Sequence, residues 1–247
     1  MTASLLVSTR RVFDLALGQM LWGRRTTLLV LAAGLPVLLA VVTRMTLSTG
    51  SAVVQINGRQ IGSEAVFSTA ITLLYLRFIV PAVGVFYGTS LIADEVEDQT
   101  ITYLFVRPIP RGAIVLGKYL AYLLCVTSLV LPSAAVVFMV MVPFQDMAPL
   151  FGSFVRNLGV LALGLGAYGA VFLWAGALFR RPLVGGLLFV FGWEQLAAVL
   201  PGYLGRLTIA HYLHADTISV TALLATTIGA LWLAMRTIER REYLLER

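Results

Sequence analysis

The densest group of reactive side chains in the sequence is a run of four carboxylates within five residues: Asp94, Glu95, Glu97 and Asp98. Clustered carboxylates can act as general acids and bases or hold a divalent cation, but such sites need further catalytic groups or ligands close by. No histidine accompanies this run. Asp94 and Glu97 instead have the spacing of a capping box, and carboxylates are stabilised at the start of a helix. The run therefore predicts a helix N-terminus.

An apolar stripe follows the carboxylates. Ile101, Leu104 and Phe105 fall on one side of a helix, and Pro108 would end that helix. Arg107 and Arg111 make its far end basic. The pattern predicts a short amphipathic helix, acidic at one end and basic at the other, within residues 94–112.

This amphipathic segment has three interpretations. A solvated loop of a membrane protein would account for the two arginines, but not for four carboxylates or for the stripe between the charged ends. Adsorption to lipid is disfavoured because anionic lipid repels the acidic end. A stripe with charged ends is typical of a docking element for another protein, and this is the interpretation that we favour.

Two ionisable residues, Arg77 and Glu194, interrupt long apolar stretches. Charges within a bilayer are costly and usually face the protein interior or a water-filled path. They could pair with each other or reach a helix end, or they could line a substrate route or a subunit interface. His211 and His214 lie near Asp216, but no third ligand has convincing spacing. We therefore predict no metal site and no catalytic residue.

Composition places these groups in a membrane protein. Hydrophobic residues make up 59% of the 247 residues and charged residues only 12%, against about 45–50% and about 25% in soluble domains. Soluble enzymes, disordered chains and disulfide-rich scaffolds are excluded. A single cysteine, Cys125, rules out an internal disulfide. The net charge of +6 is attributed to arginines on one membrane face, so no nucleic-acid partner is expected.

The fold class predicted is all-α and integral to the membrane, with six transmembrane helices in a single domain, residues 1–247. The expected spans are Thr26–Thr43, Ala65–Ala93, Ala113–Val142, Leu158–Phe179, Leu183–Leu200 and Ile218–Met235. The count would become five or seven if one of two regions were interpreted differently. These regions are the long second and third stretches and the short turn at residues 180–182. Twelve arginines then lie on one side and four on the other, with Arg77 and Lys118 inside spans. This bias predicts that both termini are cytoplasmic, in the cell membrane.

Three smaller features complete the expected layout. Residues 1–25 place Phe13, Ala16 and Leu17 on one helical face, which predicts a helix in the inner membrane surface rather than a cytosolic tail. Asn57-Gly58 indicates a small hairpin in the outer loop. Small residues recur every four positions in the fourth span, which favours close helix packing within the chain over a subunit interface.

The run from Asp94 to Ile101, continuing through Arg107-Pro108-Ile109-Pro110-Arg111 to Leu116-Gly117-Lys118, resembles the coupling region of ABC transporter permeases of the type-2 exporter class. In that family an acidic stretch and a threonine, here Thr100, precede an Arg-Pro pair, a second arginine and a Gly-Lys pair at the third span. The sequence departs from the family at Gln99, where members often carry glycine.

The resemblance implies a permease that pairs with itself or a sibling and binds two cytosolic ATPase subunits, surrounded by membrane lipid. Residues 94–112 would be the coupling segment, and the helix near residues 94–106 would receive the movement of those ATPases. ATP and Mg²⁺ would be bound by the partners and no cofactor by this chain, which has no phosphate-loop motif. The substrate is unidentified and expected to be lipophilic. The alternatives are a passive channel or scaffold, or a membrane enzyme acting on lipid.

Overall fold

The computed structural model describes residues 5–48, 55–56, 59–60, 63–97, 111–179, 181–199, 208–213 and 216–240. Within them the helical elements are, in chain order, α1 (Leu5–Leu21), α2 (Arg24–Ser48), α3 (Ser63–Ala70), η1 (Ile71–Ile79), α4 (Val80–Val83), η2 (Gly84–Gly88), α5 (Thr89–Glu97), α7 (Arg111–Met141), η3 (Phe144–Asp146), α8 (Met147–Leu178), α9 (Pro182–Leu187), η4 (Leu188–Trp193), α10 (Glu194–Val199), η6 (Ala210–Tyr212) and α11 (Thr217–Arg240). Strands β1 (Gln55–Ile56) and β2 (Arg59–Gln60) pair antiparallel on either side of Asn57-Gly58.

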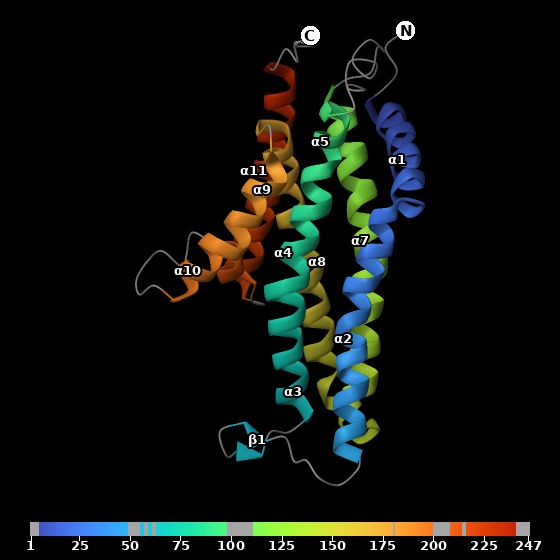
Figure 1. Ribbon diagram of the computed structural model, residues 1–247, viewed down its shortest axis with the longest axis vertical. Coiled ribbons are helices and arrows are strands. Elements are labelled where there is room, and N and C mark those ends of the chain that lie inside the picture. Colours follow the sequence, from blue (N-terminus) through green and yellow to red (C-terminus); the bar gives the residue numbers. More distant parts are fainter. Residues whose placement is uncertain are drawn as a thin grey trace.

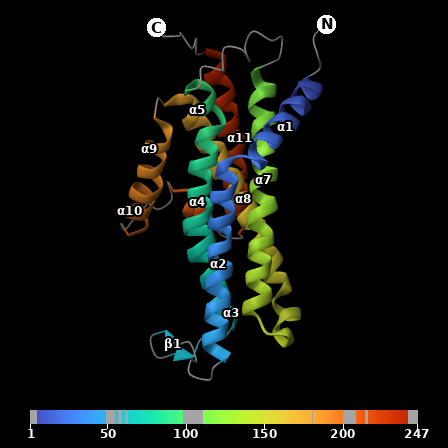
Figure 2. The same ribbon diagram turned by 45° about the vertical axis from the view of Figure 1, so that its right-hand side comes forward.

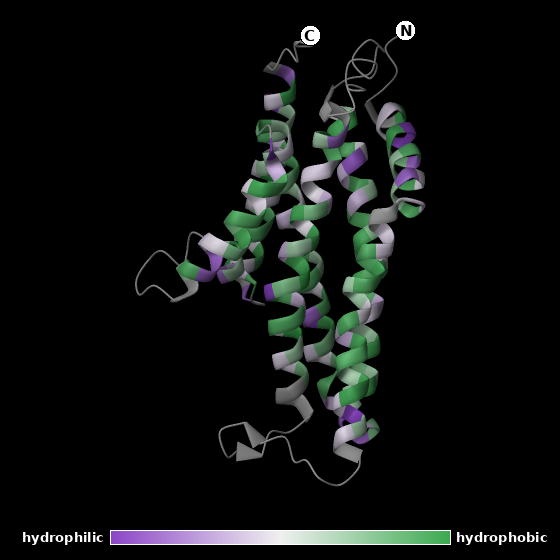
Figure 3. Ribbon diagram, in the orientation of Figure 1, coloured by the Kyte–Doolittle hydropathy of each residue, from purple (hydrophilic) through white to green (hydrophobic). Residues whose placement is uncertain are grey.

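The long helices run side by side along the long axis of the molecule, as Figures 1 and 2 show. Hydrophobic residues cover most of their length, whereas hydrophilic residues gather on α1 and toward the helix ends (Figure 3). Five helical runs in the described parts of the chain are long and apolar enough to cross a membrane: Thr26–Thr46, Phe67–Asp94, Gly112–Met141, Phe144–Leu178 and Ile218–Glu239. The structure is thus that of a multi-pass membrane protein.

The segment expected to form the fifth span is different. It is a shorter apolar helical run, Pro182–Ala197, that changes to a π-helix in η4 before Glu194 begins α10. In Figure 1 this run diverges from the bundle, and α10 ends near the middle of the long axis, where α11 also starts. Six full-length spans are therefore not established by this structure, because the described part of this run is shorter than the other five runs.

The fourth long helix starts earlier than the sequence suggested. Residues 143–157 were expected to form an outer loop, but η3 and α8 make most of this stretch helical. Phe154 is buried and stacks on Phe138 of α7 with ring centroids 4.4 Å apart, and Phe67 meets Phe138 edge-on at 5.1 Å. This aromatic cluster stabilises an extra helical stretch that hydropathy alone did not mark.

The core is centred on α8, which packs against α4, η2, α5, α7 and α11. Glycines allow these approaches. A Cβ on Gly84 would lie 2.6 Å from the Cβ of Tyr168, and a Cβ on Gly176 would lie 2.5 Å from the carbonyl oxygen of Thr89. These contacts lie within one chain, so the small residues of this helix serve internal packing, as their spacing favoured.

Candidate functional site

The acidic residues that open the expected coupling segment lie at the end of a helix. Asp94, Glu95 and Glu97 belong to α5, which continues the second long helical run to Glu97. The expected capping box is therefore wrong, because Asp94 is a helix residue near a C-terminus rather than the residue before an N-terminus. Carboxylates are disfavoured at this end of the helix dipole, so their presence is not explained by helix stability.

The rest of the expected coupling helix lies outside the described residues: Asp98, Thr100, Ile101, Leu104, Phe105, Arg107 and Pro108. Arg111 begins α7. The segment is flanked by the end of α5 and the start of α7. Both lie at the end of the molecule that also holds α1 and the last turn of α11 (Figure 1). The end of α8 lies toward the same end of the molecule.

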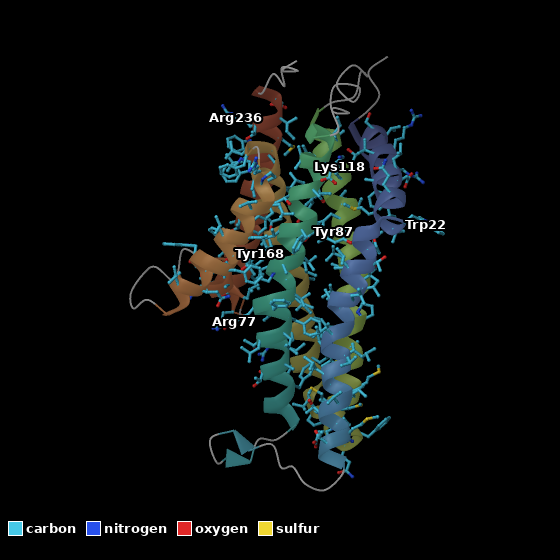
Figure 4. All side chains as sticks on the ribbon, in the orientation of Figure 1. Trp22, Arg77, Tyr87, Lys118, Tyr168 and Arg236 are labelled. Carbon is cyan, nitrogen blue, oxygen red and sulfur yellow. The ribbon has the colours of Figure 1, made fainter. Side chains whose placement is uncertain are left out.

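A buried lysine ties the two flanking helices together. Lys118 of α7 is 9% exposed, and its Nζ donates a hydrogen bond of 2.6 Å to the carbonyl oxygen of Leu91 in α5. Leu91 is three residues before Asp94. An ammonium group in an apolar span needs acceptors, and here one acceptor belongs to the helix that leads into the acidic run. Figure 4 shows Lys118 near this end of the bundle.

The neighbouring glycine, Gly117, allows a second helix to pack closely on α7. A Cβ on Gly117 would lie 2.9 Å from both the carbonyl oxygen of Thr9 and the Cβ of Val12, so α1 crosses α7 at this residue in close contact. The Gly117-Lys118 pair therefore joins α1, α5 and α7 in one unit. Sequence analysis placed Lys118 inside a span and in the Gly-Lys pair of the family resemblance but gave it no partner. Its apolar surroundings were the signal that it needs one.

The two ionisable residues within the apolar stretches do not pair with each other. Glu194 is 4% exposed, and its Oε2 accepts a hydrogen bond of 2.6 Å from the hydroxyl of Tyr168 in α8. The backbone of Ile209 and Ala210 also approaches this carboxyl group. Within the described chain no hydrogen bond of ordinary geometry reaches its Oε1. The carboxyl group thus joins α10 to α8 and faces the segment before α11.

Tyr168 was missed because its partner lies far along the sequence. The available signal was a tyrosine in the middle of a glycine-rich span, since a buried phenolic hydroxyl usually finds a hydrogen-bond partner. Gly84 of the second helical run also approaches Tyr168 closely, so Tyr168 is packed from two sides.

Arg77 lies on the outside. It is exposed in the π-helix η1, and Figure 4 shows it on the flank of the bundle. Phe78 beside it is 51% exposed and meets Phe191 of η4, with ring centroids 6.1 Å apart. An arginine beside exposed aromatic rings at mid-helix is unusual for a surface that touches only lipid chains.

The histidines lie apart from these groups. His211 is exposed and packs edge-on against the ring of Tyr212, at 5.2 Å between ring centroids. His214 lies outside the described residues. In the part of the chain that the structure describes, no three His, Cys, Asp or Glu side chains form a group that could hold a metal ion.

These features define a class: a multi-pass helical membrane protein in which buried polar side chains bond to neighbouring helices. Residues 15–233 match the family described as ABC-2 family transporter protein, and the chain belongs to this family. It is an ABC transporter permease of this family.

One curated relative is the "Probable ABC transporter permease protein NosY" of Pseudomonas aeruginosa. It is 32% identical over 118 residues, which cover 46% of this chain and 42% of that protein. The match thus spans less than half of the relative's length. The predicted family is confirmed, whereas the coupling segment and its contacts stay a prediction.

Proposed function

We propose that this chain is the membrane-spanning permease subunit of an ATP-driven exporter. It would work as a pair, with itself or a sibling permease, and bind two cytosolic ATPase subunits that hold ATP and Mg²⁺. The chain itself would hydrolyse no nucleotide. Family membership supports this proposal, and so does the gathering of α1, α5, α7 and the end of α11 at one end of the molecule.

The observation that carries the proposal is the hydrogen bond from Lys118 to Leu91. A push from an ATPase on residues 94–112 would act on the end of α5 and the start of α7. Because the buried lysine ties these helices, and Gly117 ties α7 to α1, the three helices would move as one body. In this proposal the acidic residues near the end of α5 would act as docking groups for the ATPase.

In the proposed topology both termini are cytoplasmic, α1 lies at the inner membrane surface, and the α9–α10 run counts as the fifth of six crossing segments. The positive charge bias of the sequence supports this orientation. The exposed face around Arg77, Phe78 and Phe191 is then a candidate for the subunit interface and for the path of a lipophilic substrate, since these residues would otherwise face lipid.

The test reverses the acidic charges. Glu95, Glu97 and Asp98 are changed together to lysine, and the ATP hydrolysis that co-purifies with the tagged chain from native membranes is measured. The matched control reverses Glu64, Asp146 and Asp216, which alters net charge equally away from the coupling segment. We expect the first variant to lose the co-purified ATPase and to keep the elution profile of the folded protein. If both variants retain the ATPase equally, the docking role is wrong.

A further inference from the structure

An open groove runs between α1 and α7, with a volume of about 480 Å³. We call it the α1–α7 groove. Its floor and walls are mainly Phe13, Leu120, Leu123 and Leu124, and Thr9 and Arg10 lie at its margin. Leu120 and Leu124 are 45% and 49% exposed. The groove is thus an apolar trough, accessible from outside, with one charged group on its rim.

The groove lies beside a close packing contact between the two helices. At Gly117 of α7, Thr9 and Val12 of α1 approach closely. One and two turns further along α7, Leu120 and Leu124 project beside Phe13 without being covered. Thr127, which also lines the groove, donates its hydroxyl to the carbonyl oxygen of Leu123 in its own helix at 2.6 Å. Its only hydrogen-bond donor is therefore already engaged.

Arg10 is the charged residue of the groove. Its side chain is exposed, and no ion pair to it occurs among the described residues. Asp14, one turn further along α1, is exposed but does not line the groove. Arg11 is also exposed and lies outside it. A guanidinium group without a carboxylate partner can donate two parallel N–H hydrogen bonds to the oxygens of a phosphate group.

A second groove gives the comparison that identifies the occupant. It lies between α2 and α7, has a volume of about 540 Å³, and is lined by residues such as Val37, Leu38 and Val136. No charged side chain lines it, and the hydroxyl of Ser133 within it bonds to the carbonyl oxygen of Ala33. It can accept an apolar chain but cannot select a headgroup. The α1–α7 groove adds a cation to a similar trough.

We propose that the α1–α7 groove binds one anionic phospholipid. The guanidinium group of Arg10 holds the phosphate, and an acyl chain lies along Phe13, Leu120 and Leu124. The lipid comes from the membrane leaflet nearer to α1. Because it fills the space where α1 and α7 separate, it holds α1 against the unit formed at Gly117 and Lys118. This site depends on the membrane location of the chain and not on the proposed ATPase partners.

The test uses the full chain in nanodiscs that contain phosphatidylglycerol and phosphatidylcholine in equal amounts. Native mass spectrometry after release counts the lipids retained per chain. We expect the unaltered chain to retain phosphatidylglycerol preferentially, and Arg10→Gln to lower this preference about fivefold. Arg11→Gln removes the same charge from the same helix outside the groove and should keep the preference. Arg10→Lys should restore part of it.

A second pair of variants tests the apolar part of the site. Leu124→Trp fills the trough and should reduce retained phosphatidylglycerol, whereas Met139→Trp, at an exposed position of α7 outside both grooves, should not. Size-exclusion profiles and thermal midpoints confirm that each variant is folded. Equal losses in Arg10→Gln and Arg11→Gln would mean general charge attraction and overturn the proposal. So would unchanged retention in Leu124→Trp, or equal retention of both lipids by the unaltered chain.

Discussion

Helices α2 and α8 are both long and apolar enough to cross a membrane, yet they have opposite surroundings. In the apolar stretch of α2 22% of residues are buried, against 61% in that of α8. Leu28, Leu31 and Leu38 of α2 are each more than 60% exposed. In α8 every residue from Gly164 to Ala170 is buried.

The difference follows from side-chain size. In lipid, apolar side chains gain little by leaving the solvent, so helices associate where small residues let their backbones approach. In α8, glycines at 164, 166 and 169 are each in contact with a neighbouring side chain. In α2, Gly34 has nothing within 4 Å of its Cβ position. Hydropathy therefore identifies a possible span, and glycine spacing identifies which span is the centre of the protein.

The largest effect is expected at Gly169. A Cβ there would lie 2.1 Å from the Cε1 atom of Tyr122 in α7, so Gly169→Ala must displace a buried tyrosine and should cost about 3 kcal/mol of stability. Gly159→Ala is the control, since nothing lies within 4 Å of its Cβ position. Thermal midpoints in detergent measure both. Similar midpoints would show that α8 is not packed as described.

The next effect concerns the polar contact of α8. Tyr168→Phe removes the hydrogen bond to a buried carboxyl group and should cost about 2 kcal/mol. Glu194→Gln alone should cost less because the amide oxygen can still accept this bond. A double-mutant cycle on the two positions separates the bond from other consequences of each change. Strictly additive effects would contradict a direct interaction.

Helix α7 is an intermediate case, with one face in the core and another exposed. Lys118→Met removes the bond to Leu91 and should cost about 1 kcal/mol. It should also raise amide hydrogen exchange in the last turns of α5. Thr127→Val is the control on the same helix, because its hydroxyl bonds only within α7. Unchanged exchange at the end of α5 in Lys118→Met would show that the lysine does not restrain that helix.

The smallest effect is expected on α2. Leu35 is 50% exposed, so Leu35→Ala exchanges one lipid-facing side chain for a smaller one and should change stability by less than about 0.5 kcal/mol. Thermal midpoints in detergent and in lipid nanodiscs measure the change. If Leu35→Ala instead lowered the thermal midpoint strongly, and only in the dimer, a second copy of the chain would cover this face of α2.

Several elements were predictable because they depend on local pattern. Apolar runs located the long helices, and Trp22-Gly23 separates α1 from α2 where the apolar run begins. The start of α8 was missed because Phe154 packs on Phe138 of the preceding helix and on Phe67, which lies far away in the sequence. The capping box at Asp94 failed for a similar reason: the spacing fits a helix start, but the preceding helix continues through it.

By itself the sequence determined that the chain enters a membrane, where its apolar helices lie, and which family its coupling region resembles. Each of these follows from hydropathy, charge bias or a contiguous motif, and all are properties of neighbouring residues. Only the tertiary structure decided that Glu194 bonds to Tyr168 rather than to Arg77, that Lys118 holds α5, and that the fifth apolar run is short and divergent. Those outcomes depend on which backbones approach each other, and that is set by glycines meeting side chains from distant segments.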